Sequence, residues 1–227
     1  MNKTTIIKVL NNLKNMEYDE AISTLTFELL KTEDKNKANL FSQVKSYLNK
    51  ADKTRPILRT IQHKNNLQFI CNGYSLFVFN KHIESLDTLA QASDEQSINY
   101  LAILDSKNGK FESLTSEYKF VFENLKKYID WCKAINLDKD NNGTFIPLDG
   151  RIFDANFLLD FVMLNTDDFD NIKYLKIDDV DKHLKPIHLI SDSMESLILP
   201  YRANEEFKNK TIDTFNNFKI QLKRVEE

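Results

Sequence analysis

Acidic and amide side chains recur at every second position between residues 138 and 142, a spacing that suits coordination of a metal ion. The segment DKDNNGTFIPLD, residues 138–149, matches the pattern of a calcium-binding EF-hand loop, with glycine at the sixth position for the sharp turn. Ca²⁺ or Mg²⁺ would take oxygen ligands from Asp138, Asp140, Asn142, Thr144 through its carbonyl, and Asp149. Aspartate at the twelfth position is shorter than the usual glutamate, so Ca²⁺ would bind weakly.

The flanking sequence favours a second interpretation of this loop, as an ordinary turn without metal. Pro147 and Gly150 stand where the exiting helix of an EF-hand would begin, and the sequence has no second loop to pair with it. Asp and Asn also form turns through hydrogen bonds to their own backbone. Metal-regulated binding and a structural turn therefore both remain open.

Other residues that could do chemistry are not grouped into a catalytic motif. The four histidines are isolated along the chain: His63, His82, His183 and His188. There is no GxSxG or HExxH motif, and with four glycines there is no phosphate-binding loop. Asp178, Asp179 and Asp181 could suggest a two-metal nuclease, but such a run is also typical of a polar turn. The sequence therefore predicts a protein that is not an enzyme.

Composition and charge narrow the class of protein further. The net charge of −3 argues against a generally basic nucleic-acid binder, although a local basic face is compatible with it. Cys71 and Cys132 lie beside apolar residues and are expected to be buried thiols. The N-terminal sequence lacks the features of a signal peptide, and no stretch reaches the roughly 18 apolar residues of a membrane span, so we expect a cytoplasmic protein.

The hydrophobic pattern alternates between helical and strand periods along the chain. Helical spacing predicts two helices over residues 4–31 broken near Asn15 to Asp19 and a connector over 31–37. It predicts further helices over 40–50, 116–136, 154–164 with Asp154 as its N-cap, and from Asn204 onward. Period-two patterns predict three strands over 55–80, with Pro56 at the start of the first and turns at Asn65-Asn66 and Asn72-Gly73. They also predict a hairpin at Asn108-Gly109, a short strand at Phe145, and three strands over 171–202. This order predicts an α+β fold.

Two of these segments carry motifs in a defined order. Residues 40–80 contain a helix, the turn TRPIL and a hairpin, and residues 151–202 contain the helix FDANFLLD and end in LILPYR. Together they resemble one module of the bacterial DNA sliding clamp, the β subunit of the replicative polymerase. The resemblance covers under half of the chain. It implies a clamp-like domain, two helices packed on an antiparallel sheet, over residues 37–202 with an inserted hairpin and helix at about 81–149, preceded by a helical segment over 1–36 and followed by a helical tail over 203–227.

The resemblance also implies two kinds of binding residue. Clamp helices line a DNA channel with basic side chains, for which the positions here are Lys37, Lys45, Lys50, Lys53 and Arg55. Clamps also capture short peptides of polymerases and repair proteins in an apolar pocket, whose C-terminal wall matches Leu199, Pro200, Tyr201 and Arg202. The opposite wall departs from the family at residues 71–75, and the tail after Arg202 could cover the pocket. A clamp subunit carries three modules, so this chain could close a ring only as a homo-oligomer.

Three hypotheses follow from the sequence. The first is a clamp-like module that acts in or on DNA replication through a protein partner, with DNA contact secondary. The second is a phage-encoded inhibitor that blocks a host factor and imitates DNA with the acidic residues between Asp154 and Asp170. The third is a binding protein regulated by metal at the loop 138–149.

Overall fold

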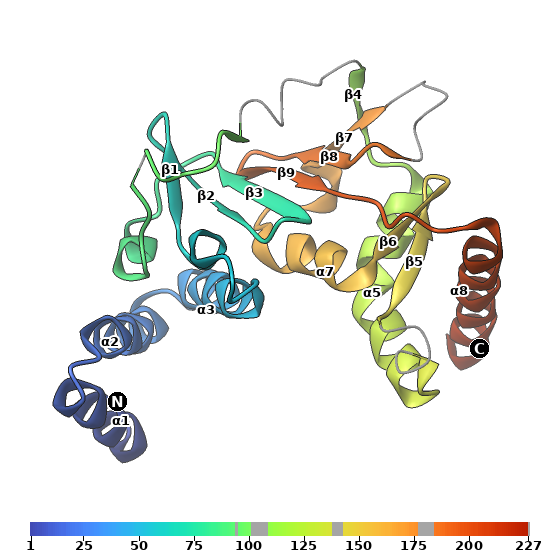
Figure 1. Ribbon diagram of the computed structural model, residues 1–227. Helices are drawn as coiled ribbons and strands as arrows, with labels where there is room; N and C mark the ends of the chain where they lie inside the picture. The colour runs from blue at the N-terminus through green and yellow to red at the C-terminus, as the bar shows by residue number, and fades with distance from the viewer. Residues whose placement is uncertain (94, 101–108, 138–142, 177–183, 227) are drawn as a thin grey trace. The chain divides into compact units, whose positions relative to one another are not determined.

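The chain folds into α-helices and antiparallel strands, which confirms the predicted α+β class. The computed structural model describes residues 1–93, 95–100, 109–137, 143–176 and 184–226. Contacts between residues divide the chain into two compact units, Met1–Ile103 and Leu104–Glu227 (Figure 1). Each unit combines helices with its own antiparallel strands.

The first unit begins with three helices, α1 (Lys3–Lys14), α2 (Tyr18–Glu33) and α3 (Lys35–Lys50), and α2 packs against both of the others. The break predicted near Asn15 to Asp19 is confirmed. The connector expected over residues 31–37 is wrong, because the two helices run almost into one another. Asp34 alone separates them, and its carboxylate caps α3 by accepting hydrogen bonds from the Asn36 and Lys37 backbone N–H groups at 2.9 and 3.2 Å.

A three-stranded meander follows, made of β1 (Gln62–Lys64), β2 (Leu67–Cys71) and β3 (Ser75–Phe79). Asn65 and Asn66 have φ angles of 51° and 63°, and Gly73 has a φ of 93°, so the two tight turns fall where the sequence predicts them. The strand start predicted at Pro56 is wrong. Pro56 opens the 3-10 helix η1 (Pro56–Arg59), because proline suits the first position of a helix as well as that of a strand.

Helix α3 covers this meander on the side of β3. The Tyr47 hydroxyl donates to the Ser75 carbonyl at 2.9 Å, and the Tyr47 ring meets the Phe77 ring edge-on at 5.4 Å. A second 3-10 helix, η2 (Glu84–Thr88), contacts β2 through Gln68, whose side chain donates to the Asp87 carboxylate at 2.8 Å. Through these contacts, α3 forms one layer and the meander forms the second layer packed against it.

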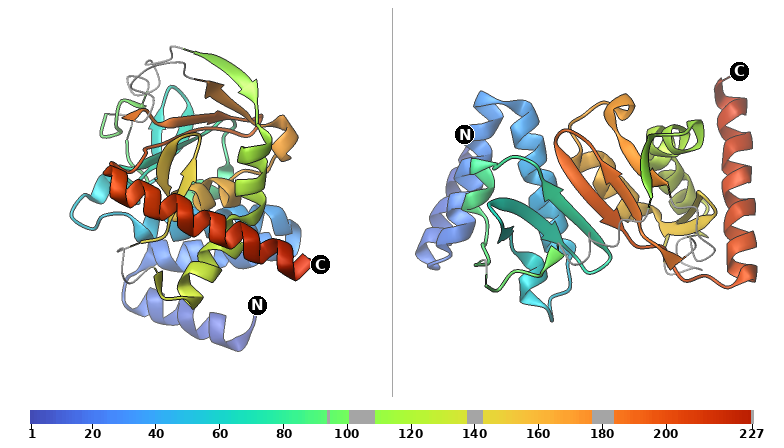
Figure 2. Two further views of the ribbon diagram at one scale, coloured as in Figure 1. Left: turned by 90° about the vertical axis from the view of Figure 1, so that its right-hand side faces the viewer. Right: turned by 90° about the horizontal axis from the view of Figure 1, so that it is seen from above.

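Among its described residues, the second unit contains four antiparallel strands of a sheet and a separate hairpin (Figures 1 and 2). The sheet order is β9 (Met194–Ile198), β8 (Ile187–Ile190), β7 (Lys173–Lys176) and β4 (Lys110–Ser113). The hairpin pairs β5 (Phe145–Leu148) with β6 (Arg151–Asp154). The three strands predicted over 171–202 and the strand at Phe145 are confirmed. Of the hairpin predicted at Asn108-Gly109, residues 101–108 lie outside the described residues, and β4 pairs with β7.

The described residues of this unit also form α5 (Ser116–Ala134), α7 (Ala155–Leu164), the short 3-10 helix η3 (Phe169–Asn171) and α8 (Glu205–Glu226). Asp154 caps α7 as predicted, by accepting from the Asn156 N–H at 2.8 Å. The predicted apolar face of α5 is buried, and its Phe122 ring lies 5.5 Å from Phe161 of α7. Helix α7 in turn packs against β9.

The two segments that resemble the sliding clamp lie in different units. Residues 40–80 belong to the first unit and residues 151–202 to the second. In each unit the clamp-like helix, α3 or α7, packs on a strand of its own sheet. A single clamp-like domain over residues 37–202 stays a prediction.

Candidate binding site at the C-terminal strand and helix

The segment Leu199–Arg202 leaves β9 as an extended chain with exposed side chains. Leu199 and Tyr201 are 41% and 49% exposed, and Arg202 is exposed as well. The Tyr201 N–H donates to the Ile152 carbonyl of β6 at 2.7 Å, which holds the backbone in place. An apolar side chain, an aromatic ring and a guanidinium are therefore presented to solvent from a fixed backbone, which favours binding of a partner.

Helix α8 follows this segment and lies beside β5 and α5 in all views (Figures 1 and 2). Asn204 starts it by accepting a hydrogen bond from the Phe207 N–H at 2.8 Å. Glu205 and Glu206 lie in the first turn and basic residues in the last, which matches the helix dipole. The helix covers part of the surface next to the exposed segment.

Aromatic rings connect α8 to β5 and α5. Phe207 lies 5.1 Å from Phe145 and 5.4 Å from Tyr201, and Tyr201 lies 4.5 Å from Phe145. Further along the helix, Phe215 and Phe218 lie 5.3 and 5.2 Å from Tyr128 of α5. Offset and edge-on rings at these distances attract one another beyond their burial.

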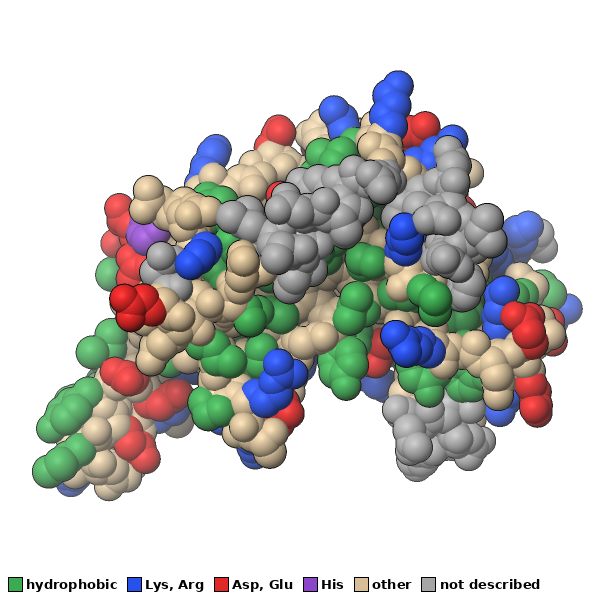
Figure 3. Space-filling view, turned by 45° about the horizontal axis from the view of Figure 1, so that its top comes forward, with side chains coloured by type: hydrophobic (Ala, Val, Ile, Leu, Met, Phe, Trp, Pro, Cys, Tyr) green, Lys and Arg blue, Asp and Glu red, His purple; other side chains and the backbone are tan. Residues whose placement is uncertain are grey.

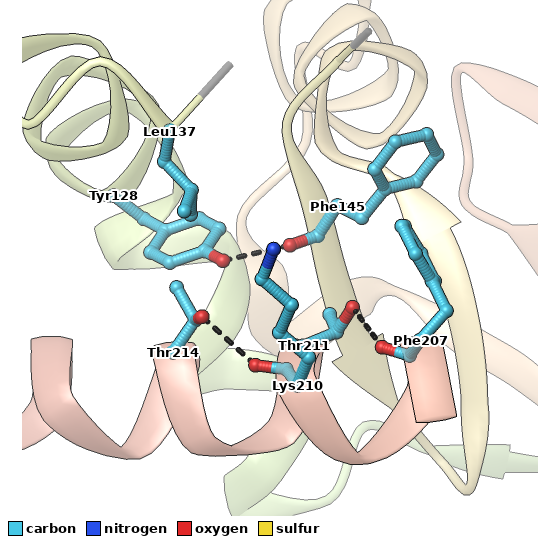
Figure 4. A pocket seen from close by; sticks show the side chains of 7 residues that line it. All are labelled: Tyr128, Leu137, Phe145, Phe207, Lys210, Thr211 and Thr214. Atoms are coloured by element: carbon cyan, nitrogen blue, oxygen red, sulfur yellow. Dashed lines mark hydrogen bonds between the residues drawn. The ribbon is translucent and has the colours of Figure 1, made fainter. Parts of the chain in front are cut away.

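A hydrogen bond to β5 holds the Tyr128 ring beside α8 (Figure 4). The Tyr128 hydroxyl donates to the Phe145 carbonyl at 2.7 Å, and burial raises the pKa of Tyr128 far above its usual value. The pocket between the helix and β5 is lined by Tyr128, Leu137, Phe145, Phe207, Lys210, Thr211 and Thr214, and its volume is ≈ 10 Å³. That volume is about that of one water molecule, so α8 itself fills this part of the surface.

A larger hollow lies further along the same helix. It has a volume of ≈ 610 Å³ and is lined by Trp131 and Ile135 on one side and by Ile220 and Gln221 of α8 on the other. Trp131 donates to the Gln221 side chain at 2.6 Å. Ile135 and Ile220 are 48% and 51% exposed, so this end of the α5–α8 contact is less closed than the end at Phe207.

A buried ion pair holds the β5–β6 hairpin against the rest of the unit. The Arg151 guanidinium donates to the Asp149 carboxylate at 2.7 Å and to the Lys185 and Pro186 carbonyls at 3.0 Å. The Tyr118 hydroxyl donates to the same carboxylate at 3.2 Å. Burial of Tyr118 raises its pKa far above the usual value, so this hydroxyl stays protonated and acts as a donor.

The candidate metal loop is described only in part. Asp138, Asp140 and Asn142 lie outside the described residues. The Thr144 carbonyl accepts a hydrogen bond from the Ala155 N–H at 2.8 Å, and the Asp149 carboxylate binds Arg151. Strand β5 lies within the second half of this loop and strand β6 follows it, whereas an EF-hand loop is followed by a helix. Among the described residues, no three His, Cys, Asp or Glu side chains are grouped as metal ligands would be.

The basic residues expected to face DNA lie in the first unit, on α3 and the turn after it. Lys37, Lys50, Lys53 and Arg55 are exposed. Lys45 donates to Glu20 of α2 at 2.9 Å and to Ser23 at 2.5 Å, so its charge is already compensated within the unit. These four exposed basic residues can neutralise phosphates. They are few, however, and acidic residues such as Asp52 lie next to them in the sequence.

Three of the acidic residues between Asp154 and Asp170 have structural partners within the second unit. Asp154 caps α7, Asp167 accepts from the Ser193 N–H at 2.8 Å, and Asp170 forms an ion pair with Lys119. The hydrogen bond and charge of Lys119 lower the pKa of Asp170. These carboxylates serve the local fold, which is the ordinary role of such residues.

No protein-family model, curated protein or solved structure matches this chain. Within the described ranges, no helix has the length and apolar character needed to cross a bilayer.

Proposed function

We propose that this chain is a non-enzymatic binding module that acts in or on DNA replication by capturing a short apolar peptide of a replication protein at Leu199–Arg202. The observation that carries the proposal is the exposure of Leu199 and Tyr201 on a backbone held by the hydrogen bond to Ile152. The class of partner comes from the resemblance of LILPYR, with its preceding segments, to the sliding clamp.

Helix α8 is the second component of the proposed site. Its Phe207 packs on Phe145 and Tyr201, the same rings that would receive the apolar side chains of a peptide. The pocket beneath it has room for one water at most, so a peptide can reach Phe145 only by taking the place of the start of α8. Binding therefore competes with the packing of this helix.

DNA contact is secondary in this proposal. Lys45 is compensated by Glu20, and the net charge of the chain is −3. Any contact of Lys37, Lys50, Lys53 and Arg55 with phosphates would weaken steeply as salt rises, whereas an apolar peptide contact would not. Titration with a DNA duplex and with peptides over a range of salt separates the two modes.

The direct test is fluorescence anisotropy with labelled peptides from replicative polymerases and repair proteins, measured on the full chain and on Tyr201→Ala. Removing a central aromatic contact should weaken peptide binding by about tenfold or more. Tyr74→Ala is the matched control, because Tyr74 is also exposed, at 61%, but lies in the first unit. Equal affinities for all three proteins, or no binding to any peptide, would rule the proposal out.

A further inference from the structure

The two N-terminal helices expose an apolar face that no described residue covers. On α1, Ile6, Leu10 and Leu13 follow one another at helical spacing and are 43–51% exposed. On α2, Ile22, Leu25 and Leu29 do the same and are 43–56% exposed. We call these six side chains the hairpin face. Hydrophobic side chains lie at the surface over these helices at the lower left of Figure 3.

Neighbouring and opposite positions on the two helices make contacts within the unit. Val9 of α1 is buried, as is Ala21 of α2. Phe27 stacks on Phe41 of α3 at 6.3 Å, and Ser23 binds Lys45 of α3. The hairpin face is therefore additional apolar surface beyond the core of the unit. A contiguous face of this kind on a folded chain marks an interaction site.

Charged residues frame the hairpin face with opposite signs on its two helices. Helix α1 carries Lys3, three residues before Ile6, and Lys14, four residues after Leu10. Helix α2 carries Asp19, three residues before Ile22, and Glu33, four residues after Leu29. All four charged side chains are exposed, and none of them has an ion-pair partner among the described residues. At the edges of the hairpin face, α1 thus carries two cations and α2 two anions, all without an ion-pair partner among the described residues.

The antiparallel packing of the helices makes this pattern complementary to itself. Lys14 and Asp19 lie at the turn end of the hairpin, and Lys3 and Glu33 at the other end. The spacing along the axis is about 16 Å between the lysines and about 21 Å between the carboxylates, a difference that lysine side chains can span. A twofold axis parallel to the helices places α1 of one copy on α2 of another, with both charge pairs matched. An axis across the helices would stack lysine on lysine.

We propose that the chain forms a twofold-symmetric dimer through the hairpin face, in which α1 and α2 of two copies make an antiparallel four-helix bundle. The apolar stripes bury one another, and Lys14 and Lys3 of each copy pair with Asp19 and Glu33 of the other. We choose a second copy as the partner because the face is complementary to itself. Its positive edge matches its own negative edge in a twofold pair, a match that binding to any other surface would not require.

Sedimentation velocity on the full chain over a range of concentrations tests the dimer. The expected mass is twice 26.6 kDa, and Leu10→Glu together with Leu29→Glu should leave a folded monomer because both side chains are exposed within one copy. Lys8→Glu is the control, since Lys8 lies on α1 away from the hairpin face and should leave the dimer intact. A wild-type monomer at all concentrations, or a dimer that survives the double change, would overturn the proposal.

Charge reversal tests the pairing itself. Lys14→Glu alone and Asp19→Lys alone should each weaken the dimer, on the order of tenfold at low salt, because symmetry repeats every repulsive pair. Mixing the two variants should restore association. In a mixed dimer, the carboxylate introduced at position 14 of one copy faces the ammonium introduced at position 19 of the other, and the second pair, Lys14 with Asp19, is native. Circular dichroism checks that each variant is folded. A mixture that dissociates as readily as its components would contradict a second copy as the partner.

Discussion

At the scale of single residues, the pair of Asp149 and Arg151 shows how a candidate ligand can serve the fold. The Arg151 side chain is 1% exposed and depends on the Asp149 carboxylate for compensation of its charge. Asp149→Asn keeps a residue that tolerates the φ of 53° but removes the negative charge. We expect the free energy of unfolding to fall by about 3 kcal/mol, because a buried charge loses its partner.

Urea unfolding at neutral pH measures this loss, and Asp170→Asn is the matched control. Asp170 also forms an ion pair, with Lys119, but its side chain is 83% exposed, so solvent replaces the partner and stability should hardly change. Equal losses for the two variants would contradict the structural role of Asp149.

The two thiols give a second prediction at this scale. Cys71 and Cys132 are buried, as the sequence predicts, and burial raises the pKa of Cys71. A raised thiol pKa lowers the fraction of reactive thiolate at neutral pH and slightly above. In the folded protein, both thiols should therefore react with a disulfide reagent far more slowly than free cysteine does. In urea, where the protein is unfolded, both should react at the rate of free cysteine. Fast reaction in native buffer would show that the thiols are accessible.

At the scale of elements, α8 is held mainly by Phe207, Phe215 and Phe218. Phe215→Ala with Phe218→Ala should loosen the helix, since each buried phenylalanine contributes about 3–5 kcal/mol. If α8 competes with the peptide, this variant should bind peptides more tightly than the native chain. Anisotropy titration compares it with Asn216→Ala, an exposed position on the same helix. Weaker binding by the loosened variant would show that α8 supports the site and does not cover it.

The sequence predicts most elements but not which of them meet. Asp154 as a helix cap and the turns at Asn65-Asn66 and Asn72-Gly73 depend on neighbouring residues, so local patterns are sufficient to predict them. The contacts of Phe215 with Tyr128 and of Arg151 with Tyr118 join residues far apart in the chain, which periodicity cannot pair. The strand start predicted at Pro56 is wrong because proline suits the start of a strand and of a 3-10 helix alike.

At the scale of the whole molecule, the two units carry different proposed contacts. The first unit holds the hairpin face, and the second holds Leu199–Arg202 with α8 beside it. Because the dimer and the peptide site share no residue, the two activities should be separable. Leu10→Glu with Leu29→Glu should bind peptides as the native chain does, and Tyr201→Ala should sediment as a dimer. Loss of both activities in either variant would show that the surfaces are linked.

The central claim is that a peptide binds at Tyr201 in competition with the start of α8. Amide hydrogen exchange of the full chain, with and without the tightest-binding peptide, tests it most directly. The claim predicts slower exchange around Tyr201 and faster exchange in the first turns of α8, from Phe207 onward, when the peptide is bound. A bound peptide that leaves both regions unchanged, or that protects α8, would contradict it.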